Sequence, residues 1–272
     1  MKRLLRASGG TVGLLLVLLV TGAALFAPWV ATHDPDALDV LARFSAPSNE
    51  HWFGTDQVGR DLYSRVVYGS RVAMAVSLSA IALALAIGVP LGVLAAWRGG
   101  WADRAVLGVL DVVASFPSLV LALAVVAVFG PGTGMTVLIV AATLVPQFAR
   151  VARAQVLGVL SAPYIEAARA LGASTPRLLL RHLMPNVLGP LIVLASMDIP
   201  VVVTIEAGLS FIGLGVQPPA ASWGTLISDG YGYLSESAWP VLTASAALAI
   251  ATLGFTLLGE ALRDAADPRL RN

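Results

Sequence analysis

Two carboxylates interrupt a long apolar stretch of this chain, and they are the first residues that could do chemistry. Asp198 and Glu206 both fall in the apolar run 187–207, Glu206 near its end. Ionisable groups inside a bilayer are costly and commonly mark the path of an ion or a substrate. Such a carboxylate can bind a coupling ion or a cargo, and it can equally be hydrogen-bonded within a helix bundle. Both interpretations stay open for Asp198, which lies deeper in the run.

Catalytic groups of other kinds are scarce. The only lysine is Lys2, so a P-loop, which places a lysine on nucleotide phosphates after a glycine-rich turn, is excluded. There are no cysteines, and the histidines His33, His51 and His182 lie outside the apolar stretches and form no HExxH pair. An intramembrane enzyme is therefore disfavoured. The sequence predicts a non-catalytic chain that holds no metal ion and no cofactor of its own.

The composition is that of an integral membrane protein. Hydrophobic residues make up 57% of the 272 residues and charged residues 12%, with a mean hydropathy of +0.83, whereas soluble domains carry roughly 25% charged residues. A net charge of +1 argues against a nucleic-acid partner, because such domains gather basic charge on one face. A helix needs about 20 apolar residues to cross a bilayer. Six candidate stretches predict an all-α, polytopic membrane helix bundle with six transmembrane helices: 11–30, 72–97, 105–129, 134–149, 187–207 and 237–259.

The distribution of basic residues predicts which side each loop occupies, because Lys and Arg accumulate in cytoplasmic loops. With the N-terminus inside, all but four of the 17 basic residues are cytoplasmic; the four outside are Arg43, Arg60, Arg65 and Arg71. Both termini are then cytoplasmic, and the first stretch is an uncleaved anchor. The predicted organisation is a cytoplasmic N-terminus at 1–10, a first transmembrane helix at 11–30, an external segment at 31–71, a transmembrane core at 72–262 with an external loop at 208–236, and a cytoplasmic C-terminus at 263–272.

Small residues recur every fourth position in the second stretch, at Ala80, Ala84, Gly88, Gly92 and Ala96. This spacing places them along one helix face, where they let two membrane helices approach closely. The ribbon is either an interface that slides during transport or a plain packing surface, and the sequence leaves both open.

A second group of candidate residues lies in the cytoplasmic segment 161–186. Pro163 is a helix-start signal and Gly172 a C-terminal cap, and Thr175 begins a second short helix that Pro185 ends. The segment therefore reads as a helical hairpin. A linker that merely lies on the surface, or re-enters the membrane, is the alternative.

The hairpin carries side chains suited to docking a partner protein. Ala167, Ala168 and Gly172 make a small-residue surface that a groove could approach, and Arg177 and Arg181, one turn apart, add charge on a common face.

Specific motifs then connect the chain to a family. Glu166, Ala167 and Ala168, followed by Gly172 and Pro185, resemble the EAA loop of ABC-importer permeases. Four further sequence segments resemble the second permease subunit of the dipeptide, oligopeptide and nickel branch. They are GTDQVGRDLYSR (54–65), SFPSLVLALAVVAVFGPG (115–132), EAGLSFIGLGVQPPAASWG (206–224) and the terminal DPRLRN (267–272).

The resemblance implies a type I ABC-importer permease fold and an import machine of several chains. This permease would form a heterodimer with a homologous permease subunit, and the pair would dock two cytoplasmic ATPase subunits, which bind the ATP and Mg²⁺. Docking would use Glu166, Ala167, Ala168, Gly172, Arg177, Arg181 and Pro185. An extracytoplasmic solute-binding protein would deliver cargo. The GLSFIGLGVQPP segment would form the outer lip of a translocation path for which Asp198, Glu206, Ser210 and Phe211 are the candidate residues.

The resemblance implies a prokaryotic plasma membrane, the inner membrane in a Gram-negative cell, with lipid around the bundle. Peptides are the expected cargo; nickel or a glutathione-type solute is the alternative in the same machine. A different class, the ion-coupled secondary transporter, would use Asp198 and Glu206 as coupling carboxylates and need no ATPase.

Overall fold

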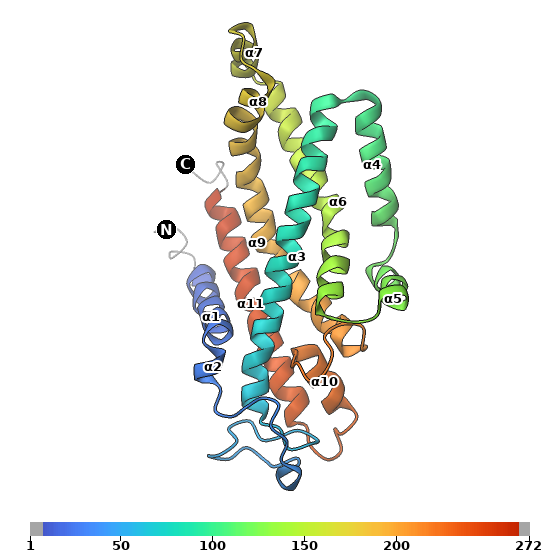
Figure 1. Ribbon diagram of the computed structural model, residues 1–272. Helices are drawn as coiled ribbons and strands as arrows, with labels where there is room; N and C mark the ends of the chain where they lie inside the picture. The colour runs from blue at the N-terminus through green and yellow to red at the C-terminus, as the bar shows by residue number, and fades with distance from the viewer. Residues whose placement is uncertain (1–7, 267–272) are drawn as a thin grey trace.

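The structure is a computed structural model that describes residues 8–266. The regular elements of this part of the chain are all helices, joined by loops that contain one isolated β-bridge. The long helices run side by side, with loops gathered at two opposite ends (Figure 1). The helices are α1 (Ser8–Leu25), α2 (Ala27–Val30), α3 (Leu62–Arg98), α4 (Gly100–Ser115), α5 (Ser118–Phe129), α6 (Thr133–Leu160), α7 (Pro163–Ala170), α8 (Thr175–Arg177), α9 (Met184–Phe211), α10 (Trp223–Tyr231) and α11 (Trp239–Ala266), with a 3-10 turn η1 (Val40–Ala42) and a π turn η2 (Leu178–Leu183). The predicted all-α bundle is confirmed.

Four helical units in the described chain are long and apolar enough to cross a membrane: α3, α6, the continuous unit of η2 with α9, and α11. α4 and α5 pass the same test together but are bent by 89°, and Gly9–Leu25 of α1 is apolar but shorter. All six predicted stretches are thus helical, but the expected count of six regular transmembrane helices is not reproduced as such.

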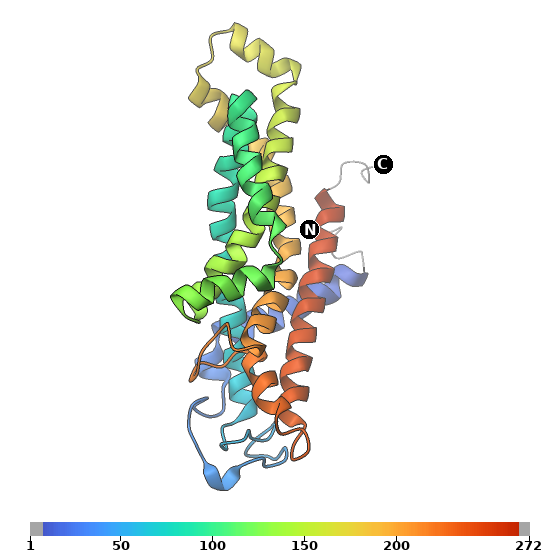
Figure 2. The same ribbon diagram turned by 90° about the vertical axis from the view of Figure 1, so that its right-hand side faces the viewer.

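The stretch 105–129 is not the single helix that we predicted. α4 ends at Ser115, and Phe116 is extended with φ −81° and ψ 128°, because the ring of Pro117 excludes the helical conformation from the residue before it. α5 then turns away and lies across the bundle (Figure 2).

The closest helix contact in the core joins α3 to α6. Ala80 and Ala84 are fully buried, and a Cβ added to Gly88 would lie 2.9 Å from the Val145 carbonyl oxygen of α6. At Gly92 the Ala149 carbonyl leaves no room for a Cβ at all. The small-residue ribbon predicted from the sequence therefore packs within the chain.

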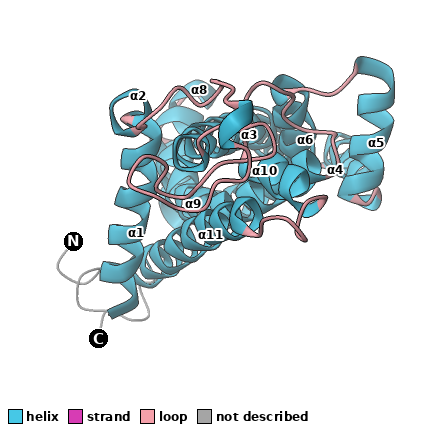
Figure 3. Cartoon of the chain, turned by 90° about the horizontal axis from the view of Figure 1, so that it is seen from below, coloured by secondary structure: helices cyan, strands magenta, loops and turns pink. Residues whose placement is uncertain are grey.

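The two ends of the bundle carry different segments. The loop of residues 31–61 and the turn of residues 232–238 between α10 and α11 lie together at one end (Figure 3), where the Phe44 and Tyr233 rings are 5.3 Å apart. The α3–α4 turn and the α7 hairpin lie at the other end (Figure 1). This separation is the one that the predicted topology requires. The predicted cytoplasmic residues Lys2, Arg3, Arg6, Arg269 and Arg271 lie outside the described residues.

Candidate functional site

The hairpin between α6 and α9 begins with a well-defined helix. Pro163 sits in the first turn of α7, where its missing N–H is unneeded. Beyond the end of α7, Gly172 has φ +79°. Its N–H donates to the Arg169 carbonyl at 2.9 Å, and the Ala173 N–H donates to the Ala168 carbonyl at 3.0 Å. These two bonds form a Schellman cap, so the predicted cap at Gly172 is confirmed.

The prediction that a second short helix ends at Pro185 is wrong. α8 passes into η2 and η2 into α9, so that Leu178–Phe211 is one continuous helical unit. In the π turn the Met184 N–H donates to the Leu179 carbonyl, five residues back. The wider turn accommodates Pro185, which has no backbone N–H to donate. The Asn186 side-chain amide donates to the His182 carbonyl at 2.6 Å. The hairpin is therefore continuous with a spanning helix.

One face of α7 holds the hairpin to the rest of the chain. Ile165 is fully buried, and the Arg169 guanidinium lies 5.5 Å from the centre of the Trp97 ring at the end of α3. The rings of Tyr164 and His182 lie 6.4 Å apart and connect α7 with η2. The predicted partner-binding residues lie elsewhere: Ala168 is half-buried, and the exposed ones are Glu166, Ala167, Gly172, Arg177, Arg181 and Pro185.

Two large apolar residues that sequence reasoning missed also face outward on this hairpin. Leu171 is 88% exposed and Leu180 is 72% exposed. Exposed apolar side chains grouped beside polar residues indicate a surface that another protein covers. Leu171 and Leu180 directly precede Gly172 and Arg181, two residues that sequence reasoning assigned to docking. Their neighbourhood is the signal that could have identified them.

Asp198 is buried in α9, 7% exposed, and interacts with α6. Its carboxylate lies beside the side chain of Gln147, and its Oδ2 atom is buried without a hydrogen-bond partner among the described residues. Gln147 itself is exposed within a spanning helix. An amide is costly in contact with lipid, so this face of α6 and α9 is suited to a polar path or a partner subunit. Sequence reasoning did not identify Gln147, although a glutamine directly after Pro146 in an apolar run is a signal that the sequence contains.

The other predicted path residues surround the outer end of α9. Glu206 is fully buried, and the Ser210 hydroxyl donates to its Oε1 at 2.8 Å while accepting from the Val216 N–H at 3.0 Å. These bonds hold the loop after α9 against the helix. Phe211 is partly exposed and meets the Tyr231 ring at 6.2 Å.

Ion pairs fix α4 to α6. Arg153 binds the Asp103 carboxylate with two hydrogen bonds of 2.6 Å, and Arg150 binds Asp111 at 2.6 Å. Asp111, the acidic residue within the predicted stretch 105–129, thus has its partner on α6.

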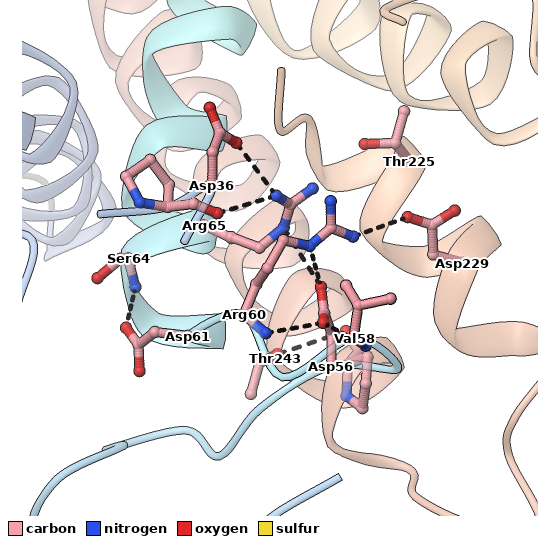
Figure 4. A network of polar contacts seen from close by, with 12 residues as sticks. Asp36, Asp56, Val58, Arg60, Asp61, Ser64, Arg65, Thr225, Asp229 and Thr243 are labelled. Carbon is pink, nitrogen blue, oxygen red and sulfur yellow. Dashed lines mark hydrogen bonds and ion pairs between the residues drawn. The ribbon is translucent and has the colours of Figure 1, made fainter. Parts of the chain in front are cut away.

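A buried ionic network occupies the opposite end of the bundle (Figure 4). The Asp56 carboxylate accepts the Arg60 Nε–H at 2.6 Å and lies 3.7 Å from Arg65 Nε. The Asp56 and Arg65 side chains are each 2% exposed. Arg65 also donates to the Pro35 carbonyl at 3.0 Å, and Arg60 Nη2 lies 3.8 Å from the Asp229 carboxylate of α10. The network joins the loop of residues 31–61 and α10 to the start of α3, a role that the GTDQVGRD motif did not reveal.

Asp61 caps α3 beside this network. Its Oδ2 accepts the Ser64 N–H at 2.8 Å, and its Oδ1 lies 3.0 Å from His51 Nδ1 and 3.8 Å from His33 Nδ1. Burial raises the pKa of the Asp61 carboxyl, but hydrogen bonds from Ser64 and His51 and the field of His33 hold that pKa below its ordinary value. The ionised carboxylate stabilises the fold at neutral pH, and this contribution is lost as the pH falls through the lowered pKa.

Comparison with known proteins identifies the family to which this apolar helix bundle belongs. Residues 88–272 match the family described as binding-protein-dependent transport system inner membrane component, and residues 1–47 match the N-terminal transmembrane domain of oligopeptide transport permease C. The chain belongs to this family of multi-pass ABC-importer permeases, in its peptide branch.

Individual relatives cover nearly the whole chain. The "Probable D,D-dipeptide transport system permease protein" of Escherichia coli is 42% identical over 93% of this chain and 85% of the relative. The glutathione transport system permease protein of Pectobacterium atrosepticum is 36% identical over 100% of this chain and 90% of its own length. Among solved structures, an inward-facing MetNI methionine ABC transporter matches with a TM-score of 0.61 and 22% identity, over 75% of this chain and 96% of that chain, which supports the fold.

Removing Arg65 should destabilise the chain strongly. Arg65→Met leaves the buried Asp56 carboxylate short of one cation, and breaking a buried pair costs about 3–5 kcal/mol. Arg71→Met is the matched control, because Arg71 is an exposed arginine of the same helix. Thermal unfolding in detergent should show a large drop for Arg65→Met only. Equal midpoints for the two variants would contradict the structural importance of the network.

Proposed function

We propose that this chain is one permease subunit of an ATP-driven peptide importer, paired with a homologous permease. One observation carries the proposal: a rigidly capped hairpin exposes Glu166, Ala167 and Leu171 at one end of the bundle and continues directly into the spanning helix α9. Relatives that are 42% and 36% identical carry dipeptide and oligopeptide transport names, which supports peptides as cargo. A relative named for glutathione supports a glutathione-type solute as the alternative.

The chain makes and breaks no covalent bonds in this proposal. Two cytoplasmic ATPase subunits bind ATP and Mg²⁺ and grip the hairpins of the two permeases. Closure of the ATPase pair moves the hairpin, and because η2 joins α9 without a break, the movement reaches Asp198 and the outer loop through a single helical unit. In this way ATP binding can shift the importer from a state whose path opens to the cytoplasm to a state whose path opens to the exterior.

Asp198 and Gln147 are the residues we assign to the translocation path. The carboxylate of Asp198 has an unpaired oxygen, and Gln147 is exposed beside it. Peptide cargo carries a positively charged amino terminus that such a carboxylate can attract. Glu206 also has an oxygen, Oε2, without a hydrogen-bond partner among the described residues, but its side chain is fully buried. Its Oε1 accepts from the Ser210 hydroxyl, which in turn accepts from the Val216 N–H of the loop after α9, and this favours a structural role at the outer lip.

The opposite end of the bundle faces the exterior of the cell in this proposal, and a solute-binding protein delivers cargo there. Both termini and the hairpin are cytoplasmic, and the membrane is the plasma membrane of a prokaryote, the inner one in a Gram-negative cell.

The coupling role predicts that Glu166→Lys uncouples the complex. Reversing an exposed charge at an interface leaves its partner unmatched, which costs about 2–5 kcal/mol, so cargo-stimulated ATP hydrolysis should fall at least about tenfold. Glu260→Lys, a charge reversal at an exposed residue of α11, is the control and should keep normal activity. The assay uses the reconstituted complex with ATP and a collapsed proton gradient. Normal coupling in Glu166→Lys would remove the hairpin surface from the mechanism, and transport that follows the gradient instead of ATP would refute the importer.

The orientation predicts opposite labelling of two introduced thiols. The chain has no cysteine, so Glu50→Cys and Trp101→Cys, both at exposed positions, are unique labels, and Trp101 lies outside the coupling hairpin. A membrane-impermeant thiol reagent should label Glu50→Cys in intact cells and Trp101→Cys only after the membrane is permeabilised. Labelling of both from the same side would contradict the proposed topology.

The path assignment predicts different effects for two carboxylate-to-amide changes in α9. Asp198→Asn keeps the size and hydrogen bonding of the side chain but removes its charge, so peptide transport should fall about tenfold with an unchanged thermal midpoint. Glu206→Gln is the matched control and should keep the transport rate within about twofold, because an amide oxygen can still accept from Ser210. Equal transport losses in the two variants would contradict the assignment of the path to Asp198.

A further inference from the structure

Three potential metal ligands from separate parts of the outer segment converge on one point. His51 Nδ1 lies 3.0 Å from Asp61 Oδ1, and His33 Nδ1 lies 3.8 Å from the same oxygen. The ligand atoms of all three residues lie within 4.8 Å of one another. The two imidazole rings are 4.8 Å apart and tilted by 34°, so two ring nitrogens approach a single carboxylate oxygen.

These separations suit a tetrahedral divalent ion. Zinc binds imidazole nitrogen and carboxylate oxygen at about 2.0–2.2 Å, which puts neighbouring ligands of a tetrahedron roughly 3.4 Å apart by geometry. The distances of 3.0 Å and 3.8 Å bracket that value. Binding requires a small rotation of the His33 ring, whose side chain is 36% exposed, and the His33 Nδ1 atom would exchange its 3.0 Å contact with the Thr32 hydroxyl for the ion.

The ligands are held in place by their surroundings. The other oxygen of the Asp61 carboxylate accepts the Ser64 N–H at 2.8 Å, and a hydrogen bond to a ligating carboxylate helps to orient it. The backbone N–H of His33 donates to the Ser64 hydroxyl at 3.0 Å, which fixes the main chain that carries the His33 ring beside the start of α3. A polar hollow of about 500 Å³, lined in part by Thr32, His33 and Asp34, lies beside the site. It offers an entry route and room for a water as the fourth ligand.

We propose that His33, His51 and Asp61 form a binding site for a zinc-type divalent metal ion on the outer segment of this permease. Imidazole with one carboxylate is a ligand set that suits zinc and neighbouring transition metals better than magnesium or calcium. The bound ion joins the residues after α2, the loop before α3 and the first turn of α3. The ion would restrain the loop of residues 31–61, which the Arg65 network also holds against α3. The site is independent of cargo and of the coupling hairpin.

Zinc titration of the purified full-length chain tests the proposal. The chain carries no histidine tag, is stripped with a chelator, and competes with a chromogenic chelator for Zn²⁺. The wild type should bind one more ion than the double variant His33→Gln/His51→Gln, and each single variant should bind at least about tenfold more weakly. Zinc should also raise the thermal midpoint of the wild type, because a ligand that binds only the folded state stabilises it. His182→Gln, which alters the histidine of the hairpin, should leave the zinc affinity unchanged.

A ligand exchange keeps the test decisive if the double variant does not fold. His33→Cys replaces one zinc ligand by another, and its thiolate is the only one in the chain. Loaded with Co²⁺, this variant should show a thiolate-to-cobalt charge-transfer band that His33→Cys/His51→Gln lacks or shows at much higher cobalt concentration. Equal zinc binding by wild type and double variant, or no cobalt band in His33→Cys, would overturn the proposal and leave the cluster as a hydrogen-bonded helix cap only.

Discussion

The close contact of α3 with α6 is the constraint on which the other features depend. At Gly88 and Gly92 the backbone of one helix meets carbonyl groups of the other, and no side chain larger than hydrogen fits without a shift. Such contacts are how membrane helices associate when lipid supplies no hydrophobic driving force between them. With α3 and α6 joined, the start of α3 can carry the outer network at one end, while the end of α6 supports α7 at the other. The two functional ends are thereby held on one rigid pair.

A second helical unit connects the same two ends by a different route. Leu178–Phe211 begins in the hairpin and finishes at the outer lip, where the Ser228 hydroxyl of α10 donates to the Phe211 carbonyl at 2.7 Å. α10 is in turn fixed to α3, because the Trp223 indole N–H donates to the Val66 carbonyl at 3.0 Å. A partner that moves the hairpin therefore acts on a helix whose far end is tied to α3 by directional bonds. The π turn η2 lies in the second arm of the hairpin, directly before α9, where a helix can absorb a change of direction without breaking.

The sequence predicts the parts of this molecule that depend on local patterns. The length of the apolar stretches predicts the long helices. The four-residue spacing of small residues predicts the close-packed face of α3, and Gly172 predicts the C-terminal cap of α7. The errors arise at two prolines whose effect on the helix depends on the local backbone. Pro117 interrupts an apolar stretch that we predicted as one helix, whereas Pro185 does not end a helix because a π turn accommodates it. The missed residues depend on long-range contacts. Nothing local indicates that His33 meets Asp61, that Arg60 reaches Asp229, or that Gln147 meets Asp198, because these pairs form only when separate segments fold together.

The outer network shows why a membrane permease uses buried charge where apolar packing would also be stable. Burying Asp56 with Arg65 gives little net stability, since desolvation offsets most of the attraction. Apolar contacts, however, are non-directional and would let the loops settle on α3 in several registers. The Asp56 carboxylate accepts from the Val58 and Arg60 N–H groups at 3.0 Å each, so the loop has only one arrangement that satisfies its charges. Because Arg60 also approaches Asp229, the same arrangement fixes α10. A displacement of α9 and α10 against α3 consequently changes ionic contacts at the outer end as well as packing in the core.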